Sequence, residues 1–441
     1  MEDNNQDAIG FVFPESNPHI IKVIGVGGGG GNAVNHMYQT GIHDVGFVVC
    51  NTDRQALDDS PVQYKVQLGS EGLGAGNIPE KARVAAEESI EAIDKMLSDG
   101  TKMVFITAGM GGGTGTGAAP IIAREAKSKN ILTVGIVTIP FVFEGEKKID
   151  TALNGVEEIS KNVDALLVVN NERLRQIYPT KNIIEAFGHA DDTLTIAARS
   201  IAEIITTHGQ INLDFNDVCT VLRDGGVAIM STGVGEGESR VKAAIEDALN
   251  SPLLNNNDIF DAKKILLYIY CSNKEDETMT VEEIDEVDEF MKKFGSKYEI
   301  KWGLAYDPEL AKKIKITVLA SGFGLSNVPG IKERNTHISP MDAIDNDEEE
   351  ERKRKRREGV YGTRIIGKKP YSQANKIFIF NDVNIDNDDI IALVEQTPTK
   401  SRTTQTLRHI NEKDQRDNYT DNEQADNEQQ NNPATINFVK S

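Results

Sequence analysis

Hydrophobic residues in the first 180 positions form short apolar runs that alternate with longer amphipathic stretches. The apolar runs predict buried strands at 20–26, 46–50, 64–68, 103–107, 131–139 and 163–169. The amphipathic stretches predict helices at 31–40, 79–98, 118–128 and 147–161. Such alternation is typical of a doubly wound, mostly parallel sheet. We therefore expect a Rossmann-like α/β domain at residues 19–180, after a flexible polar arm at residues 1–18.

A long helical pattern follows, and the order of the elements then changes. One buried stripe at helical spacing predicts a central helix within residues 181–211; it contains Leu194, Ala197, Ile201, Ile204 and Ile205. Residues 212–325 predict a second, smaller α/β domain. Its expected helices are 215–224, 238–250 and 280–294, and its expected strands are 226–231, 263–271, 297–305 and 313–320.

Residues 326–441 lose this periodicity and are mostly polar or charged. Such a composition buries too little apolar area to offset chain entropy, so we expect a largely disordered linker and tail. An acidic run at 347–351 followed by the basic run Arg352–Arg357 predicts a solvated, self-pairing helix in preference to a nucleic-acid site. The apolar segments Lys376–Phe380 and Ile390–Val394 suggest a short region that folds on binding.

The overall charge narrows the possible functions. The chain of 441 residues has a formal net charge of −21, and almost all of the acidic excess lies in residues 1–325. This argues against general nucleic-acid binding, which requires a basic surface. No stretch is apolar for long enough to span a bilayer, and no secretory signal is visible. The three widely spaced cysteines, Cys50, Cys219 and Cys271, are expected to be reduced core residues of a cytosolic protein.

Three glycine-rich segments are candidate phosphate-binding loops: Gly25–Gly31, Gly72–Gly76 and Gly111–Gly117. Glycine lets the backbone approach a ligand closely, and the helix that follows offers unpaired N–H groups and a positive dipole end. The run at Gly111–Gly117 lacks the lysine of the common nucleoside-triphosphatase loop. Three such loops in one chain predict a polyphosphate ligand.

One of these loops also supports an alternative function. Gly25, Gly27 and Gly30 match the dinucleotide pattern G-x-G-x-x-G, and Asp53 follows the second strand, where it could hold a ribose. A Rossmann-type NAD-dependent oxidoreductase is therefore an alternative, and so is a purely structural close approach of helix and strand. The oxidoreductase leaves the threonine-rich loop at Gly111–Gly117 unexplained.

The chain resembles the tubulin superfamily, and within it the FtsZ family of bacterial cell-division GTPases. The matching segments are Ala108–Gly117, Gly72–Gly76, Pro140–Gly145, Asn212–Asp217, Ser251–Leu254 and Ile316–Phe323. They cover residues 19–324 in the order of that family. The resemblance implies GTP and GDP as ligands with Mg²⁺, leaves a monovalent cation open, and assigns no protein side chain to a metal.

The resemblance also implies which residues hold the nucleotide. Phosphates are expected at Gly28, Gly29, Gly112, Gly113, Thr114, Gly115 and Thr116, and the ribose at Glu144. Guanine is expected at Asn32, Asn171, Phe187 and Asp191. From the residues alone, core packing is an alternative for Phe187, and a helix N-cap is the preferred interpretation of Asp191. Lys148, which we also assign to the nucleotide site, stands where the family usually has arginine, so a point charge replaces a bidentate fork.

A third set of residues is expected to be catalytic. Asp214 and Asp217 are three residues apart at the start of a predicted helix, and their spacing alone predicts helix caps. The resemblance instead implies that Asn212, Asp214 and Asp217 complete the active site of a neighbouring subunit, so that GTP hydrolysis depends on head-to-tail polymerisation. A nucleotide-binding filament protein that does not hydrolyse is a further alternative.

The resemblance finally implies partners and a location. The expected partners are other copies of this chain, together with membrane-tether and regulatory division proteins that bind the tail, without direct membrane insertion. The expected location is the cytoplasmic mid-cell division ring. The family's usual tail peptide is not recognisable; Ile390–Val394 is the preferred candidate over Ile436–Val439. Two further departures are Glu172 in place of a commoner aspartate and an expanded loop at Asn255–Asn257.

Overall fold

The computed structural model describes residues 19–42, 44–177, 183–207, 209–250, 259–294, 298–324, 346–362 and 387–397, and the single residues 406 and 410. The chain divides into two compact units, 1–365 and 366–441, each considered by itself. The polar arm at 1–18, the segments Lys376–Phe380 and Ile436–Val439, and the loop Asn255–Asn257 lie outside the described residues.

The strands of the first unit are β1 (Ile21–Val26), β2 (Val45–Asn51), β3 (Tyr64–Gln67), β4 (Met103–Gly109), β5 (Leu132–Ile139), β6 (Ala165–Asn170), β7 (Gly226–Gly235), β8 (Lys264–Cys271), β9 (Glu299–Tyr306) and β10 (Ile314–Phe323). Its helices are α1 (Gly27–Thr40), α2 (Arg54–Asp58), α3 (Pro79–Glu88), α4 (Ile90–Leu97), α5 (Thr114–Ser128), α6 (Glu146–Ser160), α7 (Asn171–Ile177), α8 (Ile183–Thr206), α9 (Phe215–Leu222), α10 (Arg240–Leu249), α11 (Val281–Met291) and α12 (Asn346–Tyr361). Short 3-10 helices are η1 (Val142–Glu144), η2 (Ile259–Asp261) and η3 (Pro308–Leu310). In the second unit, α13 spans Asp388–Gln396.

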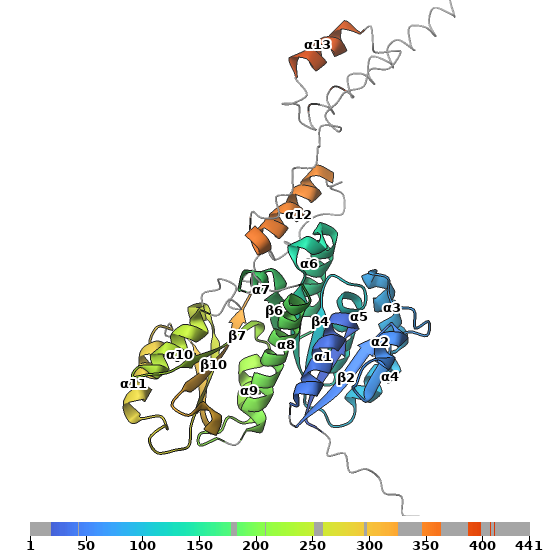
Figure 1. Ribbon diagram of the computed structural model, residues 1–441. Coiled ribbons are helices and arrows are strands. Elements are labelled where there is room, and N and C mark those ends of the chain that lie inside the picture. Colours follow the sequence, from blue (N-terminus) through green and yellow to red (C-terminus); the bar gives the residue numbers. More distant parts are fainter. Residues whose placement is uncertain are drawn as a thin grey trace, which may run out of the picture. The chain divides into compact units, whose positions relative to one another are not determined.

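The strands form one sheet in the order β3-β2-β1-β4-β5-β6-β7-β10-β8-β9 (Figure 1). Pairing is parallel from β3 to β7, antiparallel on both sides of β10, and parallel between β8 and β9. This confirms the predicted α/β class with its mostly parallel sheet. The two halves of the sheet meet where β6 and β7 pair over only two residue pairs, Ala165 with Gly226 and Leu166 with Val227.

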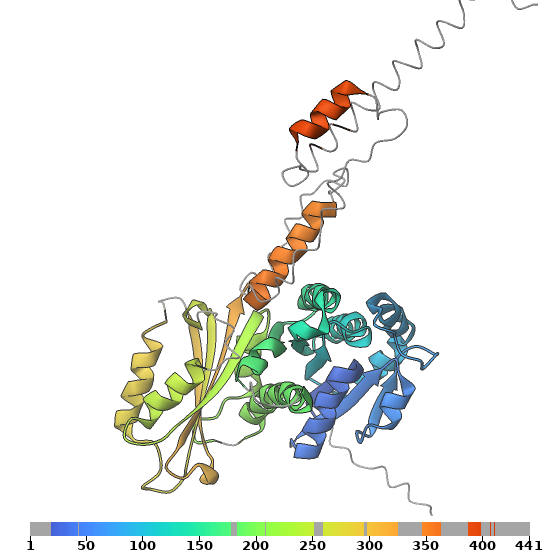
Figure 2. The same ribbon diagram turned by 45° about the horizontal axis from the view of Figure 1, so that its top comes forward.

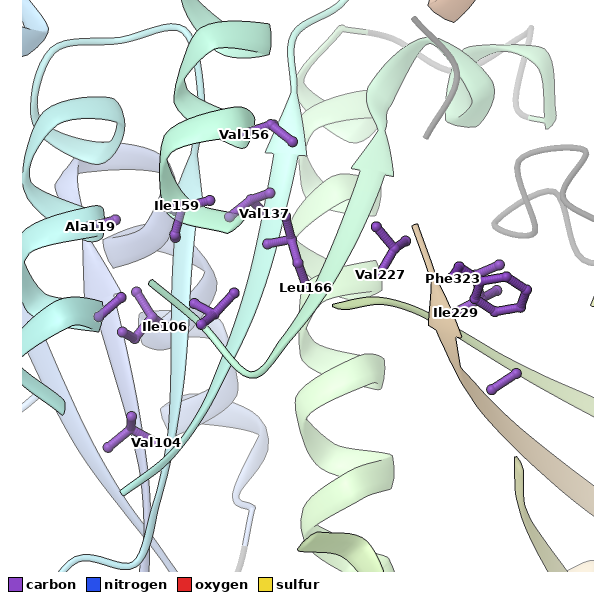
Figure 3. Close-up of a cluster of buried hydrophobic side chains, with 14 of the residues drawn as sticks. Val104, Ile106, Ala119, Val137, Val156, Ile159, Leu166, Val227, Ile229 and Phe323 are labelled. Atoms are coloured by element: carbon purple, nitrogen blue, oxygen red, sulfur yellow. The ribbon is translucent and has the colours of Figure 1, made fainter. Parts of the chain in front are cut away.

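Two hydrophobic cores cover the two faces of this sheet. One core packs α5, α6 and α10 against the strands and runs from β4 across β6 to β7 and β10 (Figure 3). The other packs α1, α8 and α9 against the opposite face. Figures 1 and 2 show these helices from two directions. Because both faces are covered, the central strands read as continuous apolar runs, and this made them recognisable in the sequence.

The central helix is longer than its buried stripe. α8 begins at Ile183 and ends at Thr206. Leu194, Ala197, Ile201 and Ile204 of the predicted stripe are buried, and Ile205 packs against the same core. At about 1.5 Å per residue, the 24 residues of α8 span roughly 36 Å. This length separates the parts of the chain that precede and follow the helix.

The charge block in residues 346–361 folds as the predicted helix, but the expectation that it is solvated is wrong for its last turns. Arg357 and Tyr361 of α12 are buried. The guanidinium of Arg357 pairs with carboxylates of α6 in addition to the pairs formed within α12. The sequence pattern did not predict this contact because it shows only the neighbours along the chain.

Two other expectations concern membranes and cysteines. Within the described ranges, no helix combines the length and the apolar character needed to cross a bilayer. Cys50, Cys219 and Cys271 are free thiols; Cys50 and Cys271 are buried and Cys219 is half-buried.

We predict that Gly30→Ala destabilises the fold whereas its neighbour Gly31→Ala does not. A Cβ at Gly30 would lie 2.1 Å from the carbonyl oxygen of Thr107 on β4, whereas a Cβ at Gly31 meets nothing within 4 Å. Gly30→Ala should lower the free energy of unfolding by about 3 kcal/mol. Gly31→Ala should raise it by about 0.5 kcal/mol through lower backbone entropy of the unfolded chain. Urea denaturation measures both; equal stability of the two variants would contradict the packing argument.

Candidate functional site

A cavity of about 630 Å³ lies at the edge of the sheet where its parallel strands end. Segments that follow β1, β2, β4, β5 and β6 line it, together with the first half of α8. Open α/β sheets bind ligands at this edge. The lining includes most of the predicted nucleotide residues, namely Gly28, Gly29, Asn32, Gly112, Gly113, Thr114, Gly115, Glu144, Lys148, Asn171 and Asp191.

Two helix N-termini contribute to the cavity lining without a side-chain cap. α1 starts directly after β1, and neither its N-cap Val26 nor Gly113, the N-cap of α5, provides a side-chain hydrogen bond. The first N–H groups of both helices therefore have no capping side chain, and the positive ends of two helix dipoles meet at one place. This arrangement suits an anion with several negative oxygens.

The candidate phosphate loops Gly25–Gly31 and Gly111–Gly117 contact each other, and this contact requires glycine. Gly27 has φ +74°, and a Cβ on it would lie 2.8 Å from the backbone nitrogen of Gly115. Gly25 and Gly30 have a different role, because a Cβ on either would collide with backbone of the same strand–helix unit or of β4. The structural explanation of the G-x-G-x-x-G pattern is thus right for Gly25 and Gly30, while Gly28 and Gly29 face the cavity.

The third glycine-rich loop, Gly72–Gly76, also lines the cavity, and it is hydrogen-bonded to the segment that follows β2. The N–H of Gly74 donates to the carbonyl of Thr52 (3.0 Å), and the N–H of Arg54 donates to the carbonyl of Gly72 (3.0 Å). The hydroxyls of Thr52 and Thr114 are 2.7 Å apart, so this loop is linked to the start of α5. Asp53 lines the cavity, but its carboxylate caps α2 by accepting from the N–H groups of Gln55 and Ala56.

Thr116 is the member of the predicted phosphate set that is not part of the cavity lining. Its hydroxyl accepts a hydrogen bond from the N–H of Gly111 at 2.9 Å, and its side chain is buried. A Cβ at Gly155 of α6 would lie 2.6 Å from the Thr116 methyl group, so the side chain fills the space between α5 and α6. Thr116 therefore supports the loop Gly111–Gly117 from the protein interior, through its hydrogen bond with Gly111.

Glu144 and Lys148 lie together at one side of the cavity. The Glu144 carboxylate accepts from the N–H of Phe141 at 2.8 Å and from Nζ of Lys148 at 2.5 Å. Glu172, the unusual residue after Asn171, is buried and accepts from the N–H of Val142 at 3.2 Å. Glu172 thus fixes the 3-10 helix η1 that carries Glu144.

Asn171 and Asp191 form the polar end of the cavity. Oδ1 of Asn171 is buried and has no hydrogen-bond partner among the residues that the structure describes, although buried acceptors are normally paired. Asp191 lies inside α8 and not at its start, so the N-cap alternative is wrong. Burial, and then the charge of Asp192, raise the pKa of Asp191 from 3.8 to about 7. The backbone of Phe187 lies in α8, but its side chain is outside the described part of the chain.

Asn212, Asp214 and Asp217 are not part of the cavity lining. They lie after the C-terminal end of α8, in the connection to α9 and in its first turn; Figure 1 labels both helices. The 15 residues of helix that separate Asp191 from Thr206 span roughly 22 Å. Asp214 and Asp217 cap α9 reciprocally, each accepting from the other's N–H, as the spacing predicts. Asn212 accepts from the N–H of Gly209 at 2.7 Å.

Lys301 of β9 holds one of these carboxylates in place. Its Nζ lies 3.0 Å from Oδ1 of Asp217. Partial burial raises the pKa of Asp217, but the hydrogen bonds donated by Lys301 and by the N–H of Asp214 outweigh it and leave the pKa below its ordinary value. Asp217 is therefore ionised at neutral pH.

Several cavity residues were missed from the sequence. Asn51, Gly109 and Thr138 lie at the carboxyl ends of β2, β4 and β5, and a rule that inspects every strand end would have found them. Leu73 and Met110 also line the cavity. Their apolar side chains carry no sequence signal for a polar ligand.

Three family models match this chain. The GTPase domain of the Tubulin/FtsZ family matches residues 20–179, the C-terminal domain of the FtsZ family matches 226–324, and a further FtsZ C-terminal model matches 372–417. A cell division protein FtsZ from Porphyromonas gingivalis is 50% identical over 428 residues, which cover 93% of this chain and 91% of that protein. This chain belongs to the FtsZ family.

Other members of the FtsZ family and solved structures support this family assignment. FtsZ of Coxiella burnetii is 45% identical over 322 residues, covering 71% of this chain and 82% of that protein. The structure of an empty FtsZ dimer from M. jannaschii is 35% identical and covers 74% of this chain and 95% of its own, with a TM-score of 0.64. CetZ1 from Haloferax volcanii, at 21% identity and a TM-score of 0.58, shares the fold. Family membership removes the NAD-dependent oxidoreductase from consideration.

We predict that Asp191→Asn stabilises the nucleotide-free protein at alkaline pH. Because the native pKa of Asp191 lies above its unfolded value, the native state binds the proton more tightly, and this residue's contribution to stability falls as pH rises from about 4 to 7. The asparagine side chain does not titrate, so it makes no pH-dependent contribution to stability in this range. The stability gain of Asp191→Asn should therefore grow by about 1–2 kcal/mol between pH 5 and pH 8.

Urea denaturation of the nucleotide-free protein at the two pH values measures this difference. Asp276→Asn, at an exposed position, is the matched control and should show no comparable change between the two pH values. A gain for Asp191→Asn that is the same at pH 5 and pH 8 would show that the carboxylate is not destabilised by burial.

Proposed function

We propose that this protein is a GTPase that assembles into head-to-tail filaments and hydrolyses GTP at the interface between two copies. One observation carries the proposal: the nucleotide-sized cavity and the acidic pair Asp214 and Asp217 lie at opposite ends of α8. A single chain cannot bring them together. A second copy stacked in the same orientation would place its acidic end over the cavity of the first, because a heterologous contact repeats along one direction.

GTP suits the polarity of the cavity. The phosphates would lie at the uncapped N-termini of α1 and α5, and the ribose beside Glu144. The unpartnered Oδ1 of Asn171 and the carboxylate of Asp191 supply acceptors for the ring N–H and exocyclic amine of guanine. Adenine lacks this pair of donors and would leave buried acceptors unpaired, which is the basis of strong discrimination.

Lys148 is the one lysine or arginine among the described residues that line the cavity. In the proposed complex it would contribute a point charge to the nucleotide instead of the two-pronged contact of an arginine. Groups of three or more His, Cys, Asp or Glu side chains that could hold a metal are absent from the described residues. A Mg²⁺ ion would therefore bind mainly through phosphate oxygens and water, which its coordination chemistry allows, and would neutralise charge on the phosphates.

The proposed chemistry is an in-line attack of water on the γ-phosphorus. The ionised Asp217 of the second copy, together with its Asp214, would orient this water and accept its proton, and Asn212 would help to position it. The bond from the γ-phosphorus to the bridging oxygen breaks, and GDP and phosphate result. Lys301 supports this role by keeping Asp217 deprotonated and fixed.

The remaining assignments follow from the same family membership. Residues 19–180 would bind GTP, residues 181–211 would act as the spacer, and residues 212–325 would complete the site of the next subunit. The protein would act in the cytoplasm at the mid-cell division ring. Tether and regulatory proteins would bind the tail at Ile390–Val394 in α13, which the third family model includes, in preference to Ile436–Val439, which it does not reach.

We predict that the specific GTPase activity falls when the protein is diluted below its assembly threshold, because each active site needs two copies. Phosphate release should be measured over a series of protein concentrations, with light scattering and electron microscopy of the same samples under GTP and GDP. Turnover proportional to protein concentration at every dilution would contradict the shared site. Filaments without phosphate release would identify a non-hydrolysing assembly protein.

We predict that Asp214→Asn lowers GTP turnover by about 100-fold while GTP binding and filament formation persist, because a charged group at the reacting water is lost. Asparagine is as good an N-cap as aspartate, so α9 should remain intact. Asp307→Asn is the matched control, because Asp307 caps η3 in the same way and does not line the cavity. Unchanged turnover of Asp214→Asn would refute the catalytic role.

Mixing two inactive variants tests whether the site is shared. Asp214→Asn binds GTP but lacks the catalytic charge, whereas Asp191→Asn retains that charge but binds GTP poorly. In random copolymers roughly a quarter of the interfaces combine an intact cavity with an intact acidic end, so this share of the wild-type activity should return. A mixture no more active than its components would exclude catalysis between copies.

A further inference from the structure

The helix α12 is anchored to α6 through its last two turns (Figure 1). The Arg357 guanidinium makes two parallel hydrogen bonds to the carboxylate of Asp150, at 2.7 and 2.6 Å, and a further one to Glu146. Arg356, one residue earlier, donates to Oδ1 of Asn154 at 2.6 Å and to the carbonyl of Leu153 at 2.8 Å. Bidentate pairs of this kind are strong and fix orientation.

The end of α12 is buried behind the nucleotide cavity. The Tyr361 hydroxyl donates to the carbonyl oxygen of Pro140 at 2.7 Å, and the side chain is 7% exposed. The side-chain amide of Asn170 donates to the carbonyl of Val360 at 3.4 Å. Burial, and then the charges of Glu144 and Glu172, raise the pKa of Tyr361.

These anchor points adjoin residues that line the cavity. Pro140 is itself part of the lining and opens the segment that carries Glu144. Glu146 and Asp150 flank Lys148 on the first two turns of α6, and Asn170 immediately precedes Asn171. The helix thus contacts one lining residue, Pro140, and segments next to three others, which are Glu144, Lys148 and Asn171. No residue of α12 itself is part of the cavity lining.

We propose that α12 is a brace for the nucleotide site, in which Arg357 and Tyr361 are positioning residues that hold Pro140–Glu144 and the start of α6 in their nucleotide-binding arrangement. This rests on the proposed function, since it assumes that the cavity binds a guanine nucleotide. The ion pair of Arg357 fixes α6, and with it Lys148. The hydroxyl of Tyr361 fixes the carbonyl that begins the turn to Glu144.

The brace is a local contact of the tail region with the GTPase domain, so loss of it should act on nucleotide binding and not on the chemical step. Arg357→Gln should raise the Kd for GDP by about tenfold, because a buried charge-assisted pair is lost. Tyr361→Phe removes only the hydroxyl and should raise it by about threefold. Arg357→Lys keeps the charge but loses the bidentate geometry, so its Kd for GDP should lie between those of the wild type and Arg357→Gln.

A fluorescent GDP analogue titrated into the full-length chain at concentrations below assembly measures these constants. Arg354→Gln is the matched control, because Arg354 pairs with Glu351 and Glu358 of its own helix and should leave the affinity unchanged. In GTPase assays the KM of Arg357→Gln should rise while kcat at saturating GTP stays near the wild-type value. A merely destabilised fold would not separate KM from kcat in this way.

A double-mutant cycle isolates the contact. Arg357→Gln should weaken GDP binding clearly less in the Asp150→Asn background than in the wild-type background, because the bidentate pair is already broken there and only the contact of Arg357 with Glu146 remains to be lost. Hydrogen exchange of the nucleotide-free protein should show faster exchange of the amides of residues 141–150 in Arg357→Gln than in Arg354→Gln.

The outcomes separate the two proposals. Wild-type protein that binds no guanine nucleotide would overturn the proposed function and the brace with it. Wild-type protein that binds GDP, with Arg357→Gln binding equally tightly, would overturn the brace alone. Equal exchange of residues 141–150 in the two arginine variants would overturn it as well, irrespective of nucleotide.

Discussion

The close approach of two strand-to-helix turns is the constraint on which the rest of the structure depends. The turns after β1 and β4 touch through Gly27 and Gly115, with no room for a Cβ at Gly27. This contact brings the uncapped N-termini of α1 and α5 together at one edge of the sheet. Two positive dipole ends in one place are unfavourable without an anion, so the apolar packing of the two cores must hold them there.

The fold was largely predictable because its strands are buried on both faces. Continuous apolar runs such as Val104–Ile106 stand out against amphipathic helices, and β1 and β4 each end in a glycine-rich turn. The glycine-rich residues expected to hold phosphates were predictable for the same reason, since most of them line the cavity. Asp191 was not predictable from the residues alone, because its place in the cavity depends on its burial within α8, and the isolated residue favoured a helix N-cap.

The contacts that the sequence could not predict are those between distant segments. Arg357 and Asp150 are separated by 207 positions, and nothing in the charge block indicates that one of its six basic residues is buried whereas the others mostly pair within the helix. Lys301 and Asp217 are a comparable case on the second half of the sheet. Local charge patterns predict a helix, but the partner of each charge depends on the tertiary fold.

In the proposed mechanism, α8 separates the residues that bind the nucleotide from those that act in hydrolysis. Asp191, in the first half of α8, bears the energetic cost of burial that recognition of guanine would require, whereas Asp217, in α9, remains charged through Lys301. In the proposed mechanism, a single copy has a complete cavity and a complete acidic end but never an active site. Because α8 lies between the two, the acidic residues of one copy would act only at the cavity of another. Hydrolysis would then depend on assembly, since the two halves of the site belong to different copies.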